Sequence, residues 1–190
     1  MNLRQTTTTL GTPRIDRSNI ENVTNLLSKR RQIYLGNSLG FYRMKELVVK
    51  SPAFENNKLL PSKYTCDGEG VNPPLTIEGI PEKAQSLALI MEDPDAAAGI
   101  FTHWIVMSIP TTGIIREKHA PGTEGLNSSR RRGYHGPCPP SGTHRYFFKV
   151  YALDTKLDLG PLAEKEDLEI AMQGHIVAQG EIIGLYRRTR

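Results

Sequence analysis

The first group of side chains that could do chemistry lies in MEDPDAAAGIFTHWIVMSIP, at residues 91–110. It contains Asp93, Asp95 and His103. An aspartate beside a histidine can accept the imidazole proton and so hold the ring in one tautomer, or it can accept a hydrogen bond from an ammonium group. We therefore treat these three residues as candidate ligand contacts.

A second group lies in GYHGPCPPSGTHRYFFKVYALD, at residues 133–154, and contains His144 and Tyr146. Imidazole and phenol groups can each donate a hydrogen bond to an anionic oxygen. Together with the aspartates of the first group, they suit a ligand that carries both a phosphate and an amine. Affinity for such a ligand should depend on pH near the ordinary histidine pKa of about 6.5, because a protonated imidazole adds charge.

Strands at residues 101–109 and 144–153 would bring the two groups together, because side chains alternate between the faces of a strand. The first strand would place on one face Phe101, His103, Ile105 and Met107. The second would place on one face His144, Tyr146, Phe148 and Val150. Two imidazoles and a phenol could then line one cavity, with His103 partly enclosed by its apolar neighbours.

Each of these motifs also has a simpler structural explanation. Asp93-Pro94-Asp95 is typical of an Asx turn, in which a side chain accepts a hydrogen bond from the backbone two residues on. A lone histidine in a strand is more often a core residue with satisfied hydrogen bonds than a ligand contact. The run Arg130–Arg132 is typical of a solvated loop. The motifs gain weight only where the fold brings them together.

The elements that must position these residues are mostly short strands. From residue 44 onward, turns such as VNPPL, SIPTTG and CPPSG separate the apolar runs, which predicts a mainly β domain. Residues 86–91 are apolar enough for a buried strand. An apolar period near 3.6 over residues 165–179 predicts one helix, with Glu164 and Asp167 suited to its N-terminus. The EIIGLYRR that follows predicts a closing strand.

Residues 1–43 differ from the rest of the chain. They begin with a polar, Thr-rich stretch, and a capping-box pattern at residues 18–21 predicts a short amphipathic helix that runs to Leu27. Met44 precedes the first strand and turn signals, so we expect one mainly β domain at residues 44–190 after a poorly ordered or helical extension. We hypothesise that the extension is appended or over-annotated; native protein whose mass begins at residue 1 would count against over-annotation.

The formal net charge of +4 is concentrated in this extension. Residues 1–43 hold seven Lys or Arg residues and two acidic ones, which leaves 17 basic and 18 acidic residues in residues 44–190. The main body is close to neutral, so we expect no nucleic-acid partner. No apolar run approaches the ~20 residues of a membrane-spanning helix, and the N-terminus lacks a secretory pattern, so we expect a cytoplasmic protein.

The chain has two cysteines, Cys66 and Cys138. Neither lies in a CxxC pair that would indicate zinc, and two cysteines do not make a disulfide framework. We expect both to be reduced thiols. A single bridge between them is the alternative, known from cytosolic proteins of thermophiles.

These segments resemble the phosphatidylethanolamine-binding protein (PEBP) family, also called Raf kinase inhibitor protein-like, in its shorter bacterial and archaeal branch. The resemblance runs from SPAFENNKLLPSKYTCDGEGVNPPL through EDPD at 92–95 and THW at 102–104. It continues through GYHGPCPPSGTHRYFFKVYALD to EDLEIAMQGHIVAQGEIIGLYRR, and so covers essentially everything after Met44. A lone DPD or HRY would be a weak signal, but their order, spacing and flanks make the match specific.

The resemblance implies a large antiparallel sheet packed against a smaller one, with peripheral helices and a small pocket for phosphate or phosphorylethanolamine groups. The residues that fall on the pocket positions of the family are Asp93, Asp95, His103, Gly136, Cys138, Pro139, His144 and Tyr146. It further implies a binding protein without a cofactor rather than an enzyme. A kinase or serine protease partner would use surface loops, and a homodimer is a further expectation.

Three features bear on how the pocket would work in this chain. Ala97 stands where the family pattern DPDAP has proline, and His135 stands where many relatives have a small or neutral residue. With Arg130–Arg132 just upstream, His135 could make the rim more attractive to anions. In the loop Gly136–Pro140, only two residues carry a backbone N–H, and a cis peptide bond is plausible because X-Pro bonds have a weak trans preference.

Two enzymatic alternatives use the same residues. Asp93, His103 and His144 could form a metal triad in a hydrolase, or Cys138 could act as a nucleophile beside a histidine. No HExxH or P-loop pattern occurs in the chain, and the two segments that hold the candidate residues contain no GxSxG. A cysteine between two prolines is more simply a small residue in a tight turn, so we favour the binding function.

Overall fold

The computed structural model describes residues 31–35, 38–42 and 45–188. The chain divides into two compact units, residues 1–43 and residues 44–190.

The described part of the first unit is a hairpin of two antiparallel strands, β1 (Arg31–Leu35) and β2 (Ser38–Tyr42). It was not predicted from the sequence. The short helix predicted at residues 18–27 lies outside the described residues.

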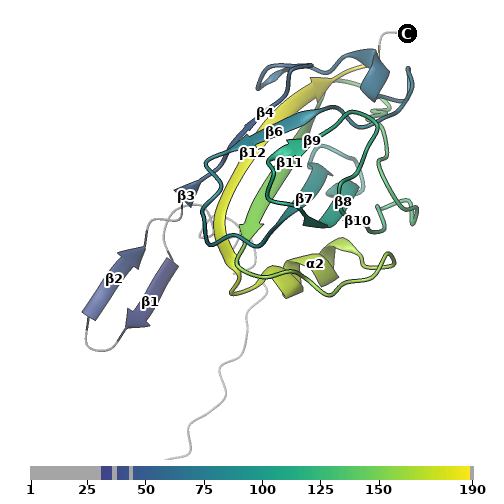
Figure 1. The fold of residues 1–190 in the computed structure, drawn as a ribbon. Coiled ribbons are helices and arrows are strands. Elements are labelled where there is room, and N and C mark those ends of the chain that lie inside the picture. Colours follow the sequence, from purple (N-terminus) through teal and green to yellow (C-terminus); the bar gives the residue numbers. More distant parts are fainter. Residues whose placement is uncertain (1–30, 36–37, 43–44, 189–190) are drawn as a thin grey trace, which may run out of the picture. The chain divides into compact units, whose positions relative to one another are not determined.

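The second unit is mainly β, as predicted, and contains two sheets (Figure 1). The seven-stranded sheet has the order β10 (Thr123–Glu124), β8 (Phe101–Ile109), β7 (Ser86–Asp93), β11 (His144–Leu153), β12 (Ile176–Tyr186) and β3 (Lys45–Glu46), and β5 (Lys58–Leu59) also pairs with β12. The three-stranded sheet has the order β4 (Val48–Lys50), β6 (Leu75–Glu78) and β9 (Ile114–Ile115). The described helices are the 3-10 turn η2 (Ser62–Tyr64) and α2 (Lys165–Met172).

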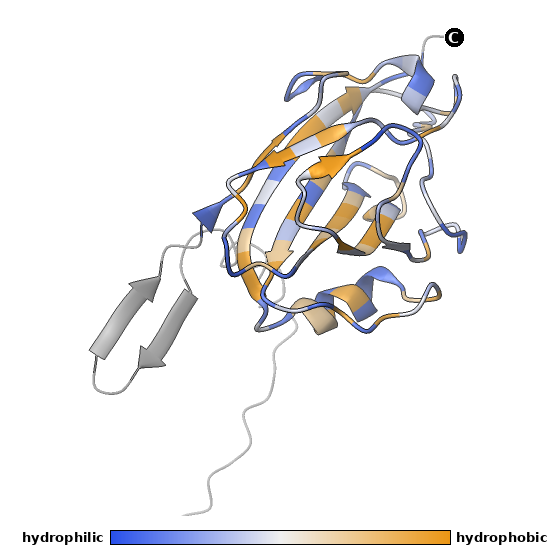
Figure 2. Cartoon of the chain, viewed as in Figure 1, coloured by the Kyte–Doolittle hydropathy of each residue, from blue (hydrophilic) through white to orange (hydrophobic). Residues whose placement is uncertain are grey.

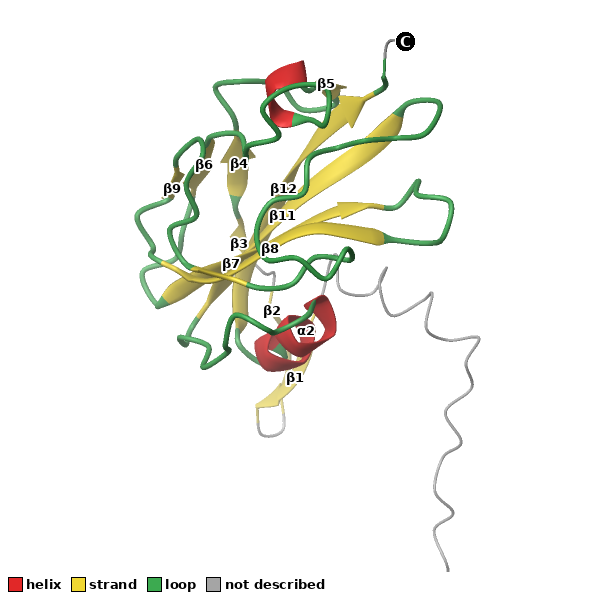
Figure 3. Ribbon diagram, turned by 90° about the vertical axis from the view of Figure 1, so that its right-hand side faces the viewer, coloured by secondary structure: helices red, strands yellow, loops and turns green. Residues whose placement is uncertain are grey.

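The large sheet is covered on both faces, and β7 shows this most directly because all eight of its residues are buried (Figure 3). Leu87, Leu89 and Met91 belong to the core between the two sheets. Ala88 and Ile90 belong to a second core, under α2. Figure 2 shows the resulting contrast between apolar central strands and polar outer loops. A continuous apolar run in the sequence is what a strand buried on both faces requires.

The strands that carry the candidate residues begin and end as the sequence predicts. Residues 101–109 form β8 and residues 144–153 form β11. The buried strand predicted at residues 86–91 extends to Asp93. The closing strand is also present, but β12 begins at Ile176, before the predicted EIIGLYRR.

The predicted helix is shorter than its apolar period indicated. α2 ends at Met172, and the last part of the predicted helix belongs to β12. Gly174 has a φ of +87°, which favours glycine and reverses the chain after the helix. Glu164 and Asp167 form the capping box at the helix start, as their positions indicated. No helix in the described part of the chain is long and apolar enough to cross a membrane.

Two further expectations need correction. The large sheet is mixed rather than purely antiparallel, because β3 and β5 both run parallel to β12. The described residues contain no cis peptide bond, so the plausible cis bond in Gly136–Pro140 is not formed. The turns of that loop are made with trans prolines.

The two sheets are joined at Leu47, which lies between β3 in the large sheet and β4 in the small one. Its N–H donates to the carbonyl of Gln179 in β12 at 2.8 Å. The neighbouring residue of β12 is Gly180, where a Cβ would lie 2.1 Å from the Leu47 carbonyl oxygen. The close crossing of the two chains therefore requires glycine at residue 180.

We expect Gly180→Ala to lower the free energy of unfolding by about 1–3 kcal/mol or more, because the added methyl group must push apart the crossing of β12 and Leu47. Gly160→Ala is the matched control, since a Cβ at this residue meets no atom within 4 Å. This substitution should change the free energy of unfolding by less than about 0.5 kcal/mol. Urea unfolding of both variants makes the comparison. Equal stabilities would show that the crossing is not tightly packed.

Candidate functional site

The candidate residues meet where three neighbouring strands begin or end. Because β7 is antiparallel to both β8 and β11, its last residues lie beside the first residues of those strands. A cavity of about 180 Å³ opens there. Its lining residues are Asp93, Ala96, Ala97, Phe101, His103, His135, Cys138, Pro139, Pro140, His144 and Tyr146. The volume is below the roughly 300 Å³ at which pockets for drug-sized ligands begin, so the cavity suits a small ligand.

A β-bulge in β8 sets the position of His103. Opposite β7, the residues on either side of it, Thr102 and Trp104, pair with consecutive residues, so His103 is the extra residue of the bulge. Bulges of this kind re-aim a side chain relative to strict alternation.

The bulge turns His103 toward the cavity. Its ring lies 4.7 Å from that of Phe101 and 5.2 Å from that of Tyr146, measured between centroids. Ile105 and Met107 instead belong to the core under α2. The prediction that His103 shares a strand face with Ile105 and Met107 is therefore wrong. The prediction that His103 is enclosed is confirmed, since its side chain is 5% exposed.

Asp93 links the end of β7 to the start of β11. One carboxylate oxygen accepts a hydrogen bond from His144 Nδ1 at 2.8 Å, and the other accepts from the backbone N–H of Asp95, also at 2.8 Å. The second contact is the Asx turn that the sequence indicated. The first holds the His144 ring in one orientation and leaves its Nε2 for a ligand. Asp93 thus has both the structural and the positioning role that the sequence left open.

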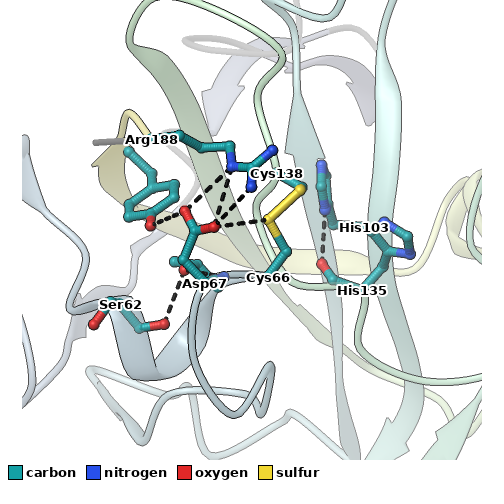
Figure 4. Close-up of a disulfide and its surroundings, with 9 residues drawn as sticks. Ser62, Cys66, Asp67, His103, His135, Cys138 and Arg188 are labelled. Atoms are coloured by element: carbon teal, nitrogen blue, oxygen red, sulfur yellow. Dashed lines mark hydrogen bonds and ion pairs between the residues drawn. A yellow bond between two sulfur atoms is a disulfide. The ribbon is translucent and has the colours of Figure 1, made fainter. Parts of the chain in front are cut away.

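His103 offers the cavity an acceptor rather than a donor. Its Nδ1 lies 2.7 Å from the carbonyl oxygen of His135, so Nδ1 carries the proton and donates (Figure 4). Burial lowers the pKa of His103 to about 4, so the ring is neutral at pH 7 and Nε2 has a free lone pair. The expectation that both imidazoles donate to an anion therefore needs correction for His103.

Tyr146 is the one buried hydroxyl at this site without a partner in the described residues. The side chain is fully buried and lines the cavity, but its OH makes no hydrogen bond there. Burial, and then the charge of Asp93, raise the pKa of the phenol, so it stays protonated. A buried hydroxyl without a partner costs about 1–3 kcal/mol, and a ligand oxygen in the cavity would remove that cost.

Two of the predicted site residues do not line the cavity. Asp95 forms two side-chain hydrogen bonds with Arg145, at 2.9 and 2.7 Å, and this pairing lowers the pKa of Asp95 to about 2. Gly136 packs against the backbone of Thr65 and Cys66, where a Cβ would lie only 3.0 Å away. Both residues shape the walls. The other six predicted residues lie together around the cavity.

Sequence reasoning missed Ala96, Phe101 and Pro140 as lining residues. Phe101 pairs with Asp93 across β7 and β8, so the register of the two strands could have found it. Ala97 and His135, noted in the sequence as departures from the family pattern, both line the cavity.

The two cysteines form a disulfide rather than the expected free thiols. Cys66 and Cys138 are 72 residues apart in the sequence, and the bond joins the loop after η2 to the loop before β11 (Figure 4). Cys138 also lines the cavity. The two residues are distant in sequence, and their loops meet where Gly136 packs against Thr65 and Cys66 and the Cys66 N–H donates to the Pro137 carbonyl.

One arginine of the Arg130–Arg132 run acts on the rim of the cavity. Burial, and then the guanidinium charge of Arg131, lower the pKa of His135. Arg130 instead pairs with Glu164 at 3.1 Å. All three arginines are exposed, which agrees with a solvated loop, but Arg131 is close enough to affect the charge of the rim.

Two other arrangements are not supported by the geometry. Within residues 45–188, no three His, Cys, Asp or Glu side chains converge as metal ligands; Asp93 and His144 bond to each other instead. A larger depression of about 410 Å³ is lined by Leu159–Ala163 and Asp167. It lacks the converging polar groups of a binding site.

Comparison with known proteins places residues 50–187 in a known family. The family described as phosphatidylethanolamine-binding protein matches residues 50–187. A UPF0098 protein of Methanothermobacter thermautotrophicus is 49% identical over 148 residues, which cover 74% of this chain and 98% of that protein. A UPF0098 protein of Pyrococcus abyssi is 51% identical over 155 residues, which cover 76% of this chain and 87% of that protein.

Solved structures show the same fold. A phosphatidylethanolamine-binding protein homolog from Chlamydia trachomatis, 38% identical, superposes with a TM-score of 0.74 over 76% of this chain and 99% of that one. YbcL of Escherichia coli, described as a member of the mammalian PEBP family, is 28% identical and has a TM-score of 0.70 over the same shares.

We expect His103 to make stability depend on pH. Its pKa is about 4 in the folded chain and 6.5 when exposed, so its contribution is complete above pH 6.5 and is lost as the pH falls toward 4. The free energy of unfolding should fall by about 3 kcal/mol more over this range than it does in His103→Leu. Urea unfolding of both proteins at several pH values measures the difference. Parallel pH profiles would mean that folding does not lower the pKa of the His103 ring.

Proposed function

Because the chain belongs to the phosphatidylethanolamine-binding protein family, we propose that its cavity binds a small phosphorylated ligand, either free or as a phospholipid head group. The observation that carries the proposal is the buried Tyr146 hydroxyl, which lines the cavity without a partner in the described residues. A phosphoryl oxygen would accept its hydrogen bond. The cavity volume of about 180 Å³ suits a head group better than acyl chains.

The remaining polar groups of the cavity complement such a ligand. His144 Nε2 can donate to a second phosphoryl oxygen when the ring is protonated, and Asp93 balances the resulting charge. His103 Nε2 accepts, so it suits a phosphoryl hydroxyl or the ammonium group of phosphorylethanolamine. The site therefore offers both donors and acceptors, which fits a ligand with both kinds of group.

The metal-dependent hydrolase is the alternative, with Asp93, His103 and His144 as ligands. Each of the two imidazoles uses its Nδ1 within the protein, and Asp93 is already bonded to one of them. We therefore prefer the binding function. The kinase or serine protease partner and the homodimer stay predictions.

We expect Tyr146→Phe to weaken binding of O-phosphorylethanolamine about tenfold, because it removes from the cavity one hydroxyl that donates a hydrogen bond to the ligand. The same change should leave the free energy of unfolding equal or higher, since it deletes a buried hydroxyl that has no partner in the described part of the chain. Calorimetric titration after metal removal and urea unfolding give the two values.

Tyr134→Phe is the matched control for this experiment. The Tyr134 hydroxyl donates to the Tyr64 carbonyl at 2.9 Å and does not line the cavity, so its loss should cost stability but not affinity. If the metal-free parent binds no phosphorylethanolamine or phosphate, and a divalent ion restores binding, the hydrolase alternative gains the support instead.

We expect Arg131→Gln to weaken phosphate binding about two- to threefold at low salt, because the guanidinium charge reaches the rim at His135. Arg130→Gln should have no effect, since Arg130 pairs with Glu164. Titrations at two salt concentrations distinguish charge attraction from a structural change. Equal affinities for both variants and the parent would remove the arginine run from the proposed site.

A further inference from the structure

The Cys66–Cys138 disulfide forms part of the cavity wall and is also open to solvent. Cys138, Pro139 and Pro140 all line the cavity. Both cysteines are exposed residues. Exposed disulfides are more readily reduced than buried structural ones and are the usual sites of reversible exchange. A soluble thiol could therefore reach this bond without unfolding the domain.

Few hydrogen bonds with other described residues hold the wall on the Cys138 side. Prolines at residues 137, 139 and 140 have no N–H to donate, so Cys138 carries the one backbone donor between Pro137 and Pro140. The hydrogen bonds found for His135–Pro140 are those to His103 and one from Cys66 N–H to the Pro137 carbonyl at 3.1 Å. Pro137 and Pro139 are buried and Gly136 packs on Thr65 and Cys66, and the disulfide adds a covalent restraint to this packing on the part of the loop that faces the cavity.

The Cys66 side is anchored independently of the disulfide. Thr65 donates from its hydroxyl to the Ser62 carbonyl at 2.8 Å, and Asp67 accepts from the Tyr186 hydroxyl at 2.7 Å. Arg188 also pairs with Asp67, at 3.0 Å (Figure 4). These contacts remain when the bond between the sulfurs is broken. Opening the bond therefore releases the Cys138 loop rather than the Cys66 loop.

We propose that Cys66–Cys138 is a reversible thiol-exchange site, and that its reduction releases the Gly136–Pro140 wall and weakens ligand binding in the cavity. The effect on affinity rests on the proposed function, whereas the release of the loop does not. The reaction partner is a dithiol of low molecular weight or on a protein.

The exchange is balanced within this pair of reactants. A thiolate of the dithiol attacks one sulfur of the bridge, the bond between Cys66 and Cys138 breaks, and a mixed disulfide forms. The second thiol of the dithiol then displaces the protein sulfur. The protein gains two electrons and two protons as two thiols, and the dithiol is oxidised to its own disulfide.

The first part of the test measures exchange and loop release without any ligand. The protein is incubated with dithiothreitol in native buffer, and free thiols are trapped with a maleimide and counted by mass spectrometry. We expect two trapped thiols, an unchanged circular dichroism spectrum, and faster amide hydrogen exchange confined to the segment around residues 136–144. Reduction only in denaturant, unfolding on reduction, or unchanged exchange in this segment would each overturn the proposal.

The second part measures affinity for O-phosphorylethanolamine by calorimetry. We expect reduction to weaken binding tenfold or more and reoxidation to restore it. A Cys66→Ser, Cys138→Ser double variant should bind the ligand as weakly as the reduced protein does, and the dithiol should not change its affinity. Ser141 is an exposed residue of the same loop, and Ser141→Ala should keep the change of affinity on reduction. Equal affinity in both redox states would overturn the link to binding.

The two parts keep this proposal separate from the proposed function. If the oxidised parent does not bind the phosphorylated ligand, the proposed function is wrong, and the thiol-exchange site is then judged on thiol trapping and hydrogen exchange alone.

Discussion

The hydrogen bonds of the buried Asp93 carboxylate determine how the functional end of the domain is built. A carboxylate that is 3% exposed must have partners, because a buried charge without them is very unfavourable. Asp93 finds them in His144 at the start of β11 and in the backbone N–H of Asp95 beyond the end of β7. One side chain thus fixes the turn, the strand end and the orientation of an imidazole.

The same requirement explains the charge character of the cavity. His103 is buried against Phe101 and Tyr146, and its one donated proton is taken by the His135 carbonyl. The inner wall is therefore neutral at His103, and the guanidinium of Arg131 adds positive charge at the rim near His135. Recognition of an anion would then depend on a few directed hydrogen bonds inside and on attraction outside.

The opposite wall has a different physical basis. A proline-rich loop cannot hold itself through backbone donors, so its position depends on contacts with the segment after η2. Gly136 allows the two backbones to approach, and the disulfide joins them. Rigid strands thus provide one side of the cavity and a covalently held loop provides the other.

The sequence by itself determined the three strands that carry the site and most of its residues. Apolar runs and alternation located β7, β8 and β11, and the face shared by His144 and Tyr146 followed from a period of two. The shorter helix, the bulge at His103 and a Tyr146 hydroxyl without a partner among the described residues were decided only by tertiary structure. Local patterns contain neither the pairing partner of a strand nor the distance between loops far apart in the chain. The Cys66–Cys138 bond, which spans 72 residues, depends on both.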